Sequence, residues 1–419
     1  MKLKTLASLS LITLVALLGL AARAQTFGTI YAFNGVDGGG PASGVTIRAG
    51  VLYGTTPCLQ GCGSGGTVYL ISRVGSNWAH TTIAFLSAQH GQLGPAARPV
   101  FGPDNHLYGT TQAGGPQGDG TVFALTPQVS ICRTANCFWA ETTLHQFSGS
   151  PDGQYPGFGD LIWDPMGDIY GTTQNGGTSD LGTVYEMTKS GNNWTETPIY
   201  SFTGPDGDFP FGGVILDSSG NLFGTTASGG LYGYGTVFEL TYTKGTGWTE
   251  TVLYNFQNLS DGEEPLGGLV MDAAGNLYGS AAYGGSEGGG TVFELSPVGN
   301  TWAFTLLYSL SGQQDMYCPE YTLGPNAPLT IDGAGNLYGT TFCDGANDLG
   351  NIFKLTNTQN GWEYTSLHDF AGGTDGAWPA SNVTIDTDGT LYGTATHGGM
   401  VSGQCGGSDG CGVVWMLKP

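Results

Sequence analysis

The sequence has 419 residues and is strongly acidic: 33 Asp and Glu residues against 11 Lys and Arg residues give a formal net charge of −22 at pH 7. So few basic residues exclude a nucleic-acid-binding surface and electrostatic attachment to an anionic membrane, since both depend on Lys and Arg. The chain contains 75 glycines, a composition that suggests disorder unless the glycines recur at regular positions.

The first 24 residues have the pattern of a secretory signal peptide. Two lysines precede an apolar stretch over 6–20, and Ala22 and Ala24 form a small-residue cleavage motif. The apolar stretch is shorter than a membrane-spanning helix requires. We therefore expect cleavage near Ala24, no membrane insertion, and export of residues 25–419 as a single domain to the extracellular space or the periplasm.

One phrase recurs seven times along the rest of the chain. LYG, or a close variant, is followed by small residues, a glycine cluster and a GTVFEL-like segment, at intervals of 53–62 residues. Short alternating apolar runs are separated by Gly, Asp and Pro, without a helical period. Units of this length predict the blades of a β-propeller. The aromatic residues of the phrase are Tyr53, Tyr108, Tyr170, Phe223, Tyr278, Tyr338 and Tyr392.

The fourth unit illustrates the four strands expected of one blade. Alternating runs predict strands over 211–217, 222–226, 235–241 and 248–256. The motif DSSGN between the first two favours a tight hairpin, because Asp bonds its own backbone and Gly accepts a positive φ angle. Each unit therefore predicts one four-stranded sheet.

The last unit has only three strands before the chain ends, near 383–386, 391–394 and 413–417. The segment TIYAF at 29–33 matches the ends of fourth strands such as LYNF at 253–256. We therefore predict an all-β fold: a seven-bladed β-propeller with four strands per blade, closed by three C-terminal strands plus one N-terminal strand. Such closure removes the exposed sheet edges of an open array.

Six tryptophans open the predicted outer strands, on the side away from the loops that usually bind ligands. We expect them to pack between blades rather than to form a binding ladder. They are Trp78, Trp139, Trp194, Trp248, Trp302 and Trp362.

The eight cysteines predict disulfides, because their number is even and the protein is expected to be exported. A zinc site is the alternative, but the spacings are not C-x-x-C and no His lies near each pair. The expected pairs are Cys58 with Cys62, Cys132 with Cys137, Cys318 with Cys343, and Cys405 with Cys411.

The repeat LYGTTxxGGxxxxGTVFELT, with W-x-x-T opening the outer strand and DGxxP after it, resembles the GloVer-type tandem repeat of secreted "choice-of-anchor" proteins. The resemblance covers essentially the whole chain after residue 24. It implies export followed by diverse C-terminal anchors, but this chain reaches Pro419 without one, so we expect no anchor. The resemblance supplies no catalytic residues. The glycine pairs and tryptophans are also similar to kelch blades, although the copper site of kelch-like galactose oxidases has no counterpart here.

The connections between predicted blades carry an Asp four residues before a Pro. A ring of carboxylates could hold Ca²⁺, which favours oxygen ligands. A repeated Asp-Gly turn explains every copy as well, so we expect no cofactor. The aspartates are Asp37, Asp152, Asp206, Asp261, Asp315 and Asp375, and the second unit has His90 and Gly91 instead.

Residues that differ among the units point to a ligand site on the loop face. Aromatic rings flanked by Asp and Asn suit the stacking and hydrogen bonding of sugars, and packing against neighbouring loops is the alternative. Near the axis, polar residues either contact a ligand or surround a water-filled tunnel. The aromatic candidates are Tyr155, Phe209, Trp378, Tyr232, Tyr234, Tyr283 and Phe342, and the polar ones are Arg98, Asp160 and Asn382.

We expect an exported, monomeric binding module for an extracellular glycan or a protein partner, with the site on the loop face. The alternative is a lyase or hydrolase acting on a polysaccharide or a small exogenous compound, in which His397 or His90 pairs with Asp37 for general acid/base chemistry. The sequence has no GxSxG, HExxH or phosphate-loop motif. A third hypothesis is a structural surface protein without a ligand.

Overall fold

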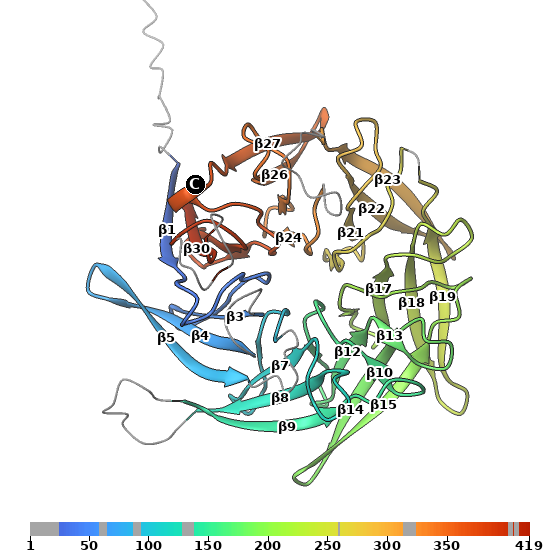
Figure 1. Ribbon diagram of the computed structural model, residues 1–419. Coiled ribbons are helices and arrows are strands. Elements are labelled where there is room, and N and C mark those ends of the chain that lie inside the picture. Colours follow the sequence, from blue (N-terminus) through green and yellow to red (C-terminus); the bar gives the residue numbers. More distant parts are fainter. Residues whose placement is uncertain are drawn as a thin grey trace, which may run out of the picture.

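The computed structural model describes residues 25–57, 65–86, 94–127, 138–258, 260–312, 324–400, 405 and 410–419. In this part of the chain, seven four-stranded antiparallel sheets surround a central axis as blades of a ring (Figure 1). Each blade runs from a short inner strand to a longer outer strand on the rim. The predicted all-β, seven-bladed propeller is confirmed, and we number its blades 1–7 in chain order.

Every blade is a meander of four neighbouring strands, ordered from the axis outward. The strands are β2 (Thr46–Arg48), β3 (Val51–Thr56), β4 (Gly66–Val74) and β5 (Asn77–Leu86) in blade 1; β6 (Val100–Phe101), β7 (Leu107–Thr111), β8 (Thr121–Thr126) and β9 (Ala140–Gln146) in blade 2; β11 (Ile162–Trp163), β12 (Ile169–Thr173), β14 (Thr183–Ser190) and β15 (Asn193–Ser201) in blade 3; β16 (Ile215–Leu216), β17 (Leu222–Thr226), β18 (Thr236–Thr243) and β19 (Gly247–Asn255) in blade 4; β20 (Val270–Met271), β21 (Leu277–Ala281), β22 (Thr291–Val298) and β23 (Thr301–Ser309) in blade 5; β24 (Thr330–Ile331), β25 (Leu337–Thr341), β26 (Asn351–Thr358) and β27 (Gly361–Asp369) in blade 6; and β28 (Thr384–Ile385), β29 (Leu391–Ala395), β30 (Val413–Lys418) and β1 (Thr26–Ala32) in blade 7.

Outside the blades, β10 (Gly153–Gln154) pairs with β13 (Asn175–Gly176). The helical content of the described residues is a single 3₁₀ turn at Gly373–Asp375. None of the helices in these residues is long and apolar enough to cross a membrane.

The glycine of each LYG phrase is required by packing within the blade. Gly224 on β17 lies opposite Phe238 of β18, and a Cβ atom at this glycine would lie 2.6 Å from the fully buried phenyl ring. Gly279 and Phe293 repeat the arrangement in blade 5, at 2.5 Å. Any other residue would displace the aromatic ring, which explains why the phrase keeps its glycine.

The two threonines that follow this glycine connect the blades. The Thr225 hydroxyl donates a hydrogen bond to the carbonyl oxygen of Gly267, at the entry to the next blade, at 2.9 Å. Equivalent bonds leave blades 1, 3, 6 and 7. The neighbouring Thr226 shares a buried hydrogen bond with Thr236 of its own blade, at 2.8 Å. The Thr-Thr pair therefore ties blades 1, 3, 4 and 6 both to themselves and to their neighbours, whereas blade 7 has Thr394 followed by Ala395 and makes only the bond to its neighbour.

The hydrophobic core lies between blades rather than within them. In one cluster, Phe223 and Phe256 of blade 4 meet Leu277 and Phe293 of blade 5, and all four are at most 3% exposed. Comparable clusters join the other neighbouring blades. Both faces of each sheet are consequently covered by the blades beside it.

The outer-strand tryptophans belong to these interfaces, as predicted. Trp248 of blade 4 packs edge-on against Tyr170 of blade 3, with ring centroids 6.1 Å apart. Trp302 of blade 5 packs in the same way against Phe223 of blade 4, at 5.9 Å. The remaining four tryptophans make the equivalent contact with the LYG aromatic residue of the preceding blade. Their role is to join blades.

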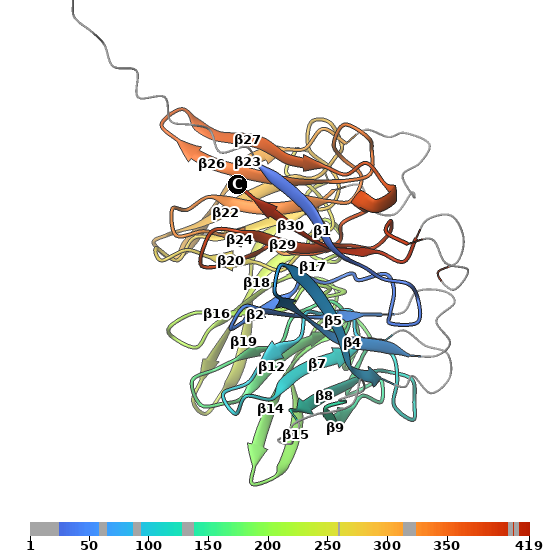
Figure 2. The ribbon, with the colours of Figure 1, turned by 90° about the vertical axis from the view of Figure 1, so that its left-hand side faces the viewer.

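Closure of the ring follows the predicted scheme. Strand β1 is the outer strand of blade 7 and runs antiparallel to β30, with Tyr31 opposite Val414 and Ala32 opposite Val413. The N–H group of Phe33 continues the pairing to the carbonyl oxygen of Gly412, at 3.0 Å. In both ribbon views the first strand, in blue, lies beside the last, in red (Figures 1 and 2). The strand begins at Thr26, three residues earlier than expected.

The inner strands are shorter than predicted. Strand β16 covers Ile215–Leu216 only, whereas the sequence suggested 211–217. The preceding Gly212 lies so close to the next blade that a Cβ atom on it would be 2.7 Å from the backbone nitrogen of Gly268. Chain segments converge at the axis, so glycine contacts between blades replace strand pairing there.

The described cysteines are oxidised. Cys405 is bonded to Cys411, as predicted, and Cys343 is buried and disulfide-bonded. The described part of the chain contains no free cysteine. The predicted pairs Cys58 with Cys62 and Cys132 with Cys137, and the proposed partner Cys318, lie outside the described residues.

Substitution of Phe33 tests whether the N-terminal strand is a full member of its blade. Phe33 and Phe256 occupy equivalent positions, since both are fully buried and both N–H groups donate to the glycine before a third strand. We expect Phe33→Ala to lower the free energy of unfolding by about 3–5 kcal/mol, the usual effect of truncating a core phenylalanine. Phe256→Ala is the matched control and should lower the free energy of unfolding by the same amount. Both variants are compared with the wild type by guanidinium denaturation. A much smaller loss for Phe33→Ala would mean that β1 is only loosely attached.

Peptide mapping under non-reducing conditions tests the disulfide assignments. We expect all eight cysteines of the exported protein to be oxidised, with Cys318 linked to Cys343 and the other pairs local in sequence. A free thiol, or a link between blades, would contradict this arrangement.

Candidate functional site

Two sets of loops lie on one face of the ring, as expected from the sequence. The connections that enter a blade pair with the loop between its second and third strands. Ala377 and His397 exchange backbone hydrogen bonds of 3.0 and 3.1 Å in blade 7, and Asp208 and Ser228 do the same in blade 4. In blade 3 the same pairing forms β10 and β13. This pairing gives the loop face a fixed framework.

The repeated aspartates of the connections are engaged within their turns. The Asp206 carboxylate accepts hydrogen bonds from the hydroxyl of Tyr200, at 2.5 Å, and from the backbone N–H of Thr203, at 2.8 Å. Asp37 is bound in the same way by Tyr31 and by the backbone of Asn34. Each of the five described aspartates thus joins its turn to the outer strand before it, and Asp315 lies outside the described residues. These contacts account for the repeated Asp as a turn residue.

A pocket of about 270 Å³ opens at the axis on the loop face. Residues of blades 1, 3, 4, 5, 6 and 7 line it. A larger cavity of about 630 Å³, lined by the inner strands, adjoins it and shares Asp160 and Asn382. The side chains that give the pocket its chemistry are three phenylalanines and three polar residues: Phe158, Phe211, Phe342, Asp160, Asn382 and His397.

Stacked aromatic rings form one wall of this pocket. The rings of Phe158 and Phe211 are nearly parallel, with centroids 4.4 Å apart and an interplanar angle of 12°. Phe209 lies behind Phe211, with centroids 6.2 Å apart. Two half-buried phenyl faces from different blades are therefore held in a fixed orientation at the mouth.

The opposite wall combines an aromatic pair with a histidine. Phe342 stacks on Trp378 with centroids 5.9 Å apart, and the Trp378 ring packs edge-on against His397 at 4.5 Å. The Nδ1 atom of His397 lies 2.9 Å from the Thr396 hydroxyl. The indole Nε1 of Trp378 is buried without a hydrogen-bond partner. This packing fixes the orientation of the imidazole beside the pocket.

The aromatic residues that precede the connection prolines adopt a left-handed backbone. Phe209 has a φ angle of 61° and Trp378 one of 55°, where blade 1 has Gly40. A residue with a side chain is disfavoured in this region by about 1–2 kcal/mol and persists only where its surroundings offset the strain. Here the rings pack on Phe211 and Phe342, so both residues support the pocket walls from behind.

An ion pair between blades 2 and 3 lies where the pocket adjoins the larger cavity: Asp160 lines both, and Arg98 lines the larger cavity only. The Arg98 guanidinium of blade 2 contacts the Asp160 carboxylate of blade 3 through Nη2 at 2.7 Å and Nε at 2.8 Å, and the Arg98 N–H adds a third bond at 3.0 Å. Asn382, which is 8% exposed, lies nearby at the entry to blade 7. Arg98 therefore neutralises the one carboxylate that lines the pocket.

Other predicted site residues lie outside this pocket. Tyr155 is tied by its backbone to Asp119 and Gln174. Tyr283 pairs with the backbone of Glu263, and burial together with nearby glutamates raises the pKa of its hydroxyl to about 12. Asp37 is bound to Tyr31 on the outer strand rather than placed beside His397. His90 is outside the described residues.

The sequence reasoning missed Phe158 and Phe211, although a positional signal existed for Phe211; Phe158 lies two positions after its proline, Pro156. Residues directly after Pro41, Pro210, Pro265, Pro325 and Pro379 line the pocket in five blades, and these residues vary in size and polarity. They are Ala42, Phe211, Leu266, Asn326 and Ala380. Comparison of the repeats at this position would have identified the pocket wall.

Comparison with solved structures reveals likeness in fold. An ulvan lyase, described as a new family of polysaccharide lyase, is 12% identical, with a TM-score of 0.54, over 93% of this chain and 95% of that chain. The same type of lyase bound to -[GlcA(1-4)Rha3S]- gives a TM-score of 0.51, at 12% identity and the same coverage. PorZ, a surface component of the type-IX secretion system of Porphyromonas gingivalis, is 16% identical, with a TM-score of 0.49, over 83% of this chain and 44% of that chain.

A search of curated proteins finds no match to this chain. Residues 133–326 match the family described as the Gloeobacter/Verrucomicrobia repeat. This segment contains β9 of blade 2, the whole of blades 3, 4 and 5, and the connection that leads into blade 6, and the same phrase continues through the other blades. The repeat match and the seven blades together show that the chain is a propeller of the Gloeobacter/Verrucomicrobia repeat type.

Proposed function

We propose that the protein is an exported carbohydrate-binding propeller whose ligand site is the pocket at the axis of the loop face. The observation that supports this proposal is the stacked pair Phe158 and Phe211 at the mouth of a pocket that also presents Asn382 and His397. Apolar faces of sugar rings pack on aromatic rings, while a few placed polar groups fix their hydroxyls. A protein partner is the other ligand class, but a recessed pocket suits a sugar end better than a protein surface.

The charge of the site favours a neutral glycan. The chain has a formal net charge of −22, and an anionic polysaccharide would be repelled by the surface around the pocket. Arg98, which lines the adjoining cavity, neutralises Asp160 of the pocket. At about 270 Å³ the pocket lies at the lower end of the usual range for ligand sites, about 300–1,000 Å³. One terminal sugar would occupy it, with the remaining chain extending over the loop face.

The signal-like N-terminus and the oxidised cysteines support action outside the cytoplasm. Disulfides persist mainly in oxidising compartments. An exported protein meets extracellular glycans directly, so the proposed location and the proposed ligand agree.

Truncation of the stacked pair tests the binding site. We expect Phe158→Ala and Phe211→Ala each to weaken binding by about 5- to 150-fold, which corresponds to about 1–3 kcal/mol for an aromatic anchor. The ligand is the neutral oligosaccharide that binds most strongly on a glycan array, and affinity is measured by titration calorimetry.

Phe85→Ala is the matched control, because this phenylalanine is 54% exposed on the outer strand β5. The Phe85→Ala variant should bind the oligosaccharide with the affinity of the wild type. Unchanged affinity in both pocket variants would exclude the pocket as the site, and a loss in Tyr283→Ala instead would move the site to the loops of blade 5.

A lyase or hydrolase is the second hypothesis, since His397 lies on the pocket wall where a general acid or base would act. The ulvan lyases share the fold. This likeness is a reason to test for enzymatic activity, but it identifies no catalytic residue in this chain. For a binding protein, His397→Ala should weaken affinity by less than about tenfold, the effect of one lost hydrogen bond. Wild-type protein should release neither reducing ends nor unsaturated products from the bound glycan. Product release that disappears in His397→Ala would establish the enzyme instead.

A further inference from the structure

A three-residue contact recurs between neighbouring blades, towards the rim of the loop face. It contains a Tyr or His near the end of one outer strand, the Asp of the following connection, and the residue two positions after Trp in the next outer strand. Between blades 4 and 5 the contact joins Tyr254, Asp261 and Phe304: the tyrosine hydroxyl donates to Asp261 at 2.9 Å, and its ring stacks on Phe304 at 4.3 Å.

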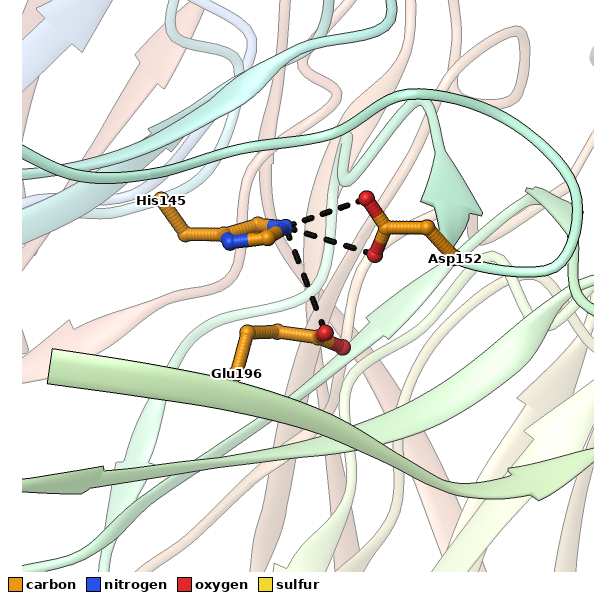
Figure 3. A group of neighbouring side chains, drawn as sticks. All are labelled: His145, Asp152 and Glu196. Carbon is orange, nitrogen blue, oxygen red and sulfur yellow. Dashed lines mark hydrogen bonds and ion pairs between the residues drawn. The ribbon is translucent and has the colours of Figure 1, made fainter.

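Between blades 2 and 3 the same positions hold His145, Asp152 and Glu196 (Figure 3). The Nε2 atom of His145 lies 3.2 and 3.3 Å from the two Asp152 oxygens and 4.0 Å from Oε2 of Glu196. One ligand atom from each side chain falls within 4.8 Å of the others. In Figure 3 the carboxylates of Asp152 and Glu196 both point towards the same ring nitrogen of His145.

Glu196 is the unusual member of this cluster. Its side chain is only 5% exposed, and its Oε1 atom is buried without a hydrogen-bond partner. A buried, unpaired carboxylate oxygen is costly unless a donor or a cation satisfies it. The carboxylate of Asp152 lies beside it, so a second negative charge opposes that of Glu196.

The separations of 3.2 and 3.3 Å between His145 and Asp152 are those of two ligands of one metal ion, whereas Glu196 Oε2, 4.0 Å from Nε2, would move closer on binding the same ion. Bonds between a charged donor and a carboxylate are usually about 2.7–2.9 Å long, shorter than the separations here. Ligand atoms at about 2.0–2.1 Å from a tetrahedral Zn²⁺ ion lie about 3.3 Å from one another. The backbone N–H of Ser148 holds Asp152 Oδ2 at 3.0 Å, so this carboxylate is already oriented.

We propose that His145, Asp152 and Glu196 bind a divalent transition-metal ion of the Zn²⁺ class. An imidazole nitrogen with two carboxylate oxygens suits such an ion, whereas Ca²⁺ prefers oxygen ligands alone. His145 is 23% exposed, which leaves a path to solvent and room for a water ligand. The ion would link the outer strands of blades 2 and 3 through the connection between them.

Other blade interfaces provide controls within the same chain. Between blades 6 and 7, His368 contacts Asp375 at 3.1 Å, but Phe27 stacks on the imidazole at 3.6 Å where blade 3 has its glutamate. Between blades 3 and 4, Glu250 occupies the glutamate position, but its neighbour is Tyr200 rather than a histidine. Among the described residues, all three metal ligands meet only between blades 2 and 3.

Titration calorimetry of the untagged, exported protein tests this site with Zn²⁺ after chelation and dialysis. We expect one Zn²⁺ ion per chain and a higher melting temperature in its presence, because an ion that binds only the folded state stabilises it. Glu196→Gln and His145→Phe should weaken Zn²⁺ binding at least tenfold. Glu196→Gln keeps the size and shape of the side chain and removes only the carboxylate ligand, so it should fold as well as the wild type in the absence of metal.

Glu250→Gln and His368→Phe are the matched controls and should bind Zn²⁺ as tightly as the wild type. Anomalous diffraction at the zinc edge should place the ion between the three side chains. The proposal is overturned if no saturable binding occurs, if Glu196→Gln binds normally, or if the controls lose as much affinity as the cluster variants. Because the cluster and the axial pocket share no residue, these outcomes are independent of the glycan experiments.

Discussion

Each blade of this propeller is stabilised by its two neighbours, because both faces of a four-stranded sheet must be covered. The clusters that contain Phe223 and Phe293 show the consequence: the core lies between sheets, and every blade needs a blade on either side. Closure of the ring by β1 follows from this requirement, because β1 is the outermost strand of blade 7. Gly224 leaves room for the ring of Phe238 within the blade, and the hydroxyl of Thr225 bonds the next blade. Most of the repeated phrase is therefore explained by packing within or between blades.

Function can therefore be sought where the repeats differ, because positions used for packing are uniform. The position after the connection proline holds alanine in blade 1 and phenylalanine in blade 4, and both residues face the axial pocket. The position held by Phe209 and Trp378 also differs among the blades. Both residues have a left-handed backbone, and their rings pack behind the pocket walls. The ring thus supplies a rigid frame, and a few variable residues at its axis determine what can bind there.

The fold could be predicted from the sequence because each repeat shows its strands locally, and TIYAF at 29–33 matched the outer strands of complete units. The site could be predicted only in part. Asp160, Asn382, Phe342 and His397 were named and do line one pocket. The stack of Phe158 on Phe211 was missed because it joins residues 53 positions apart on the neighbouring blades 3 and 4, and a repeat pattern gives no distance between blades. The meeting of His145 with Glu196 was missed for the same reason.

We propose that the axial pocket of the loop face binds a neutral sugar, and diffraction from crystals soaked in the neutral oligosaccharide with the highest affinity tests this proposal. We expect a sugar ring packed against the stack of Phe158 and Phe211, with its hydroxyls near Asn382 and His397. Sugar density on the rim tryptophans or on another loop, with the axial pocket free of sugar, would contradict it.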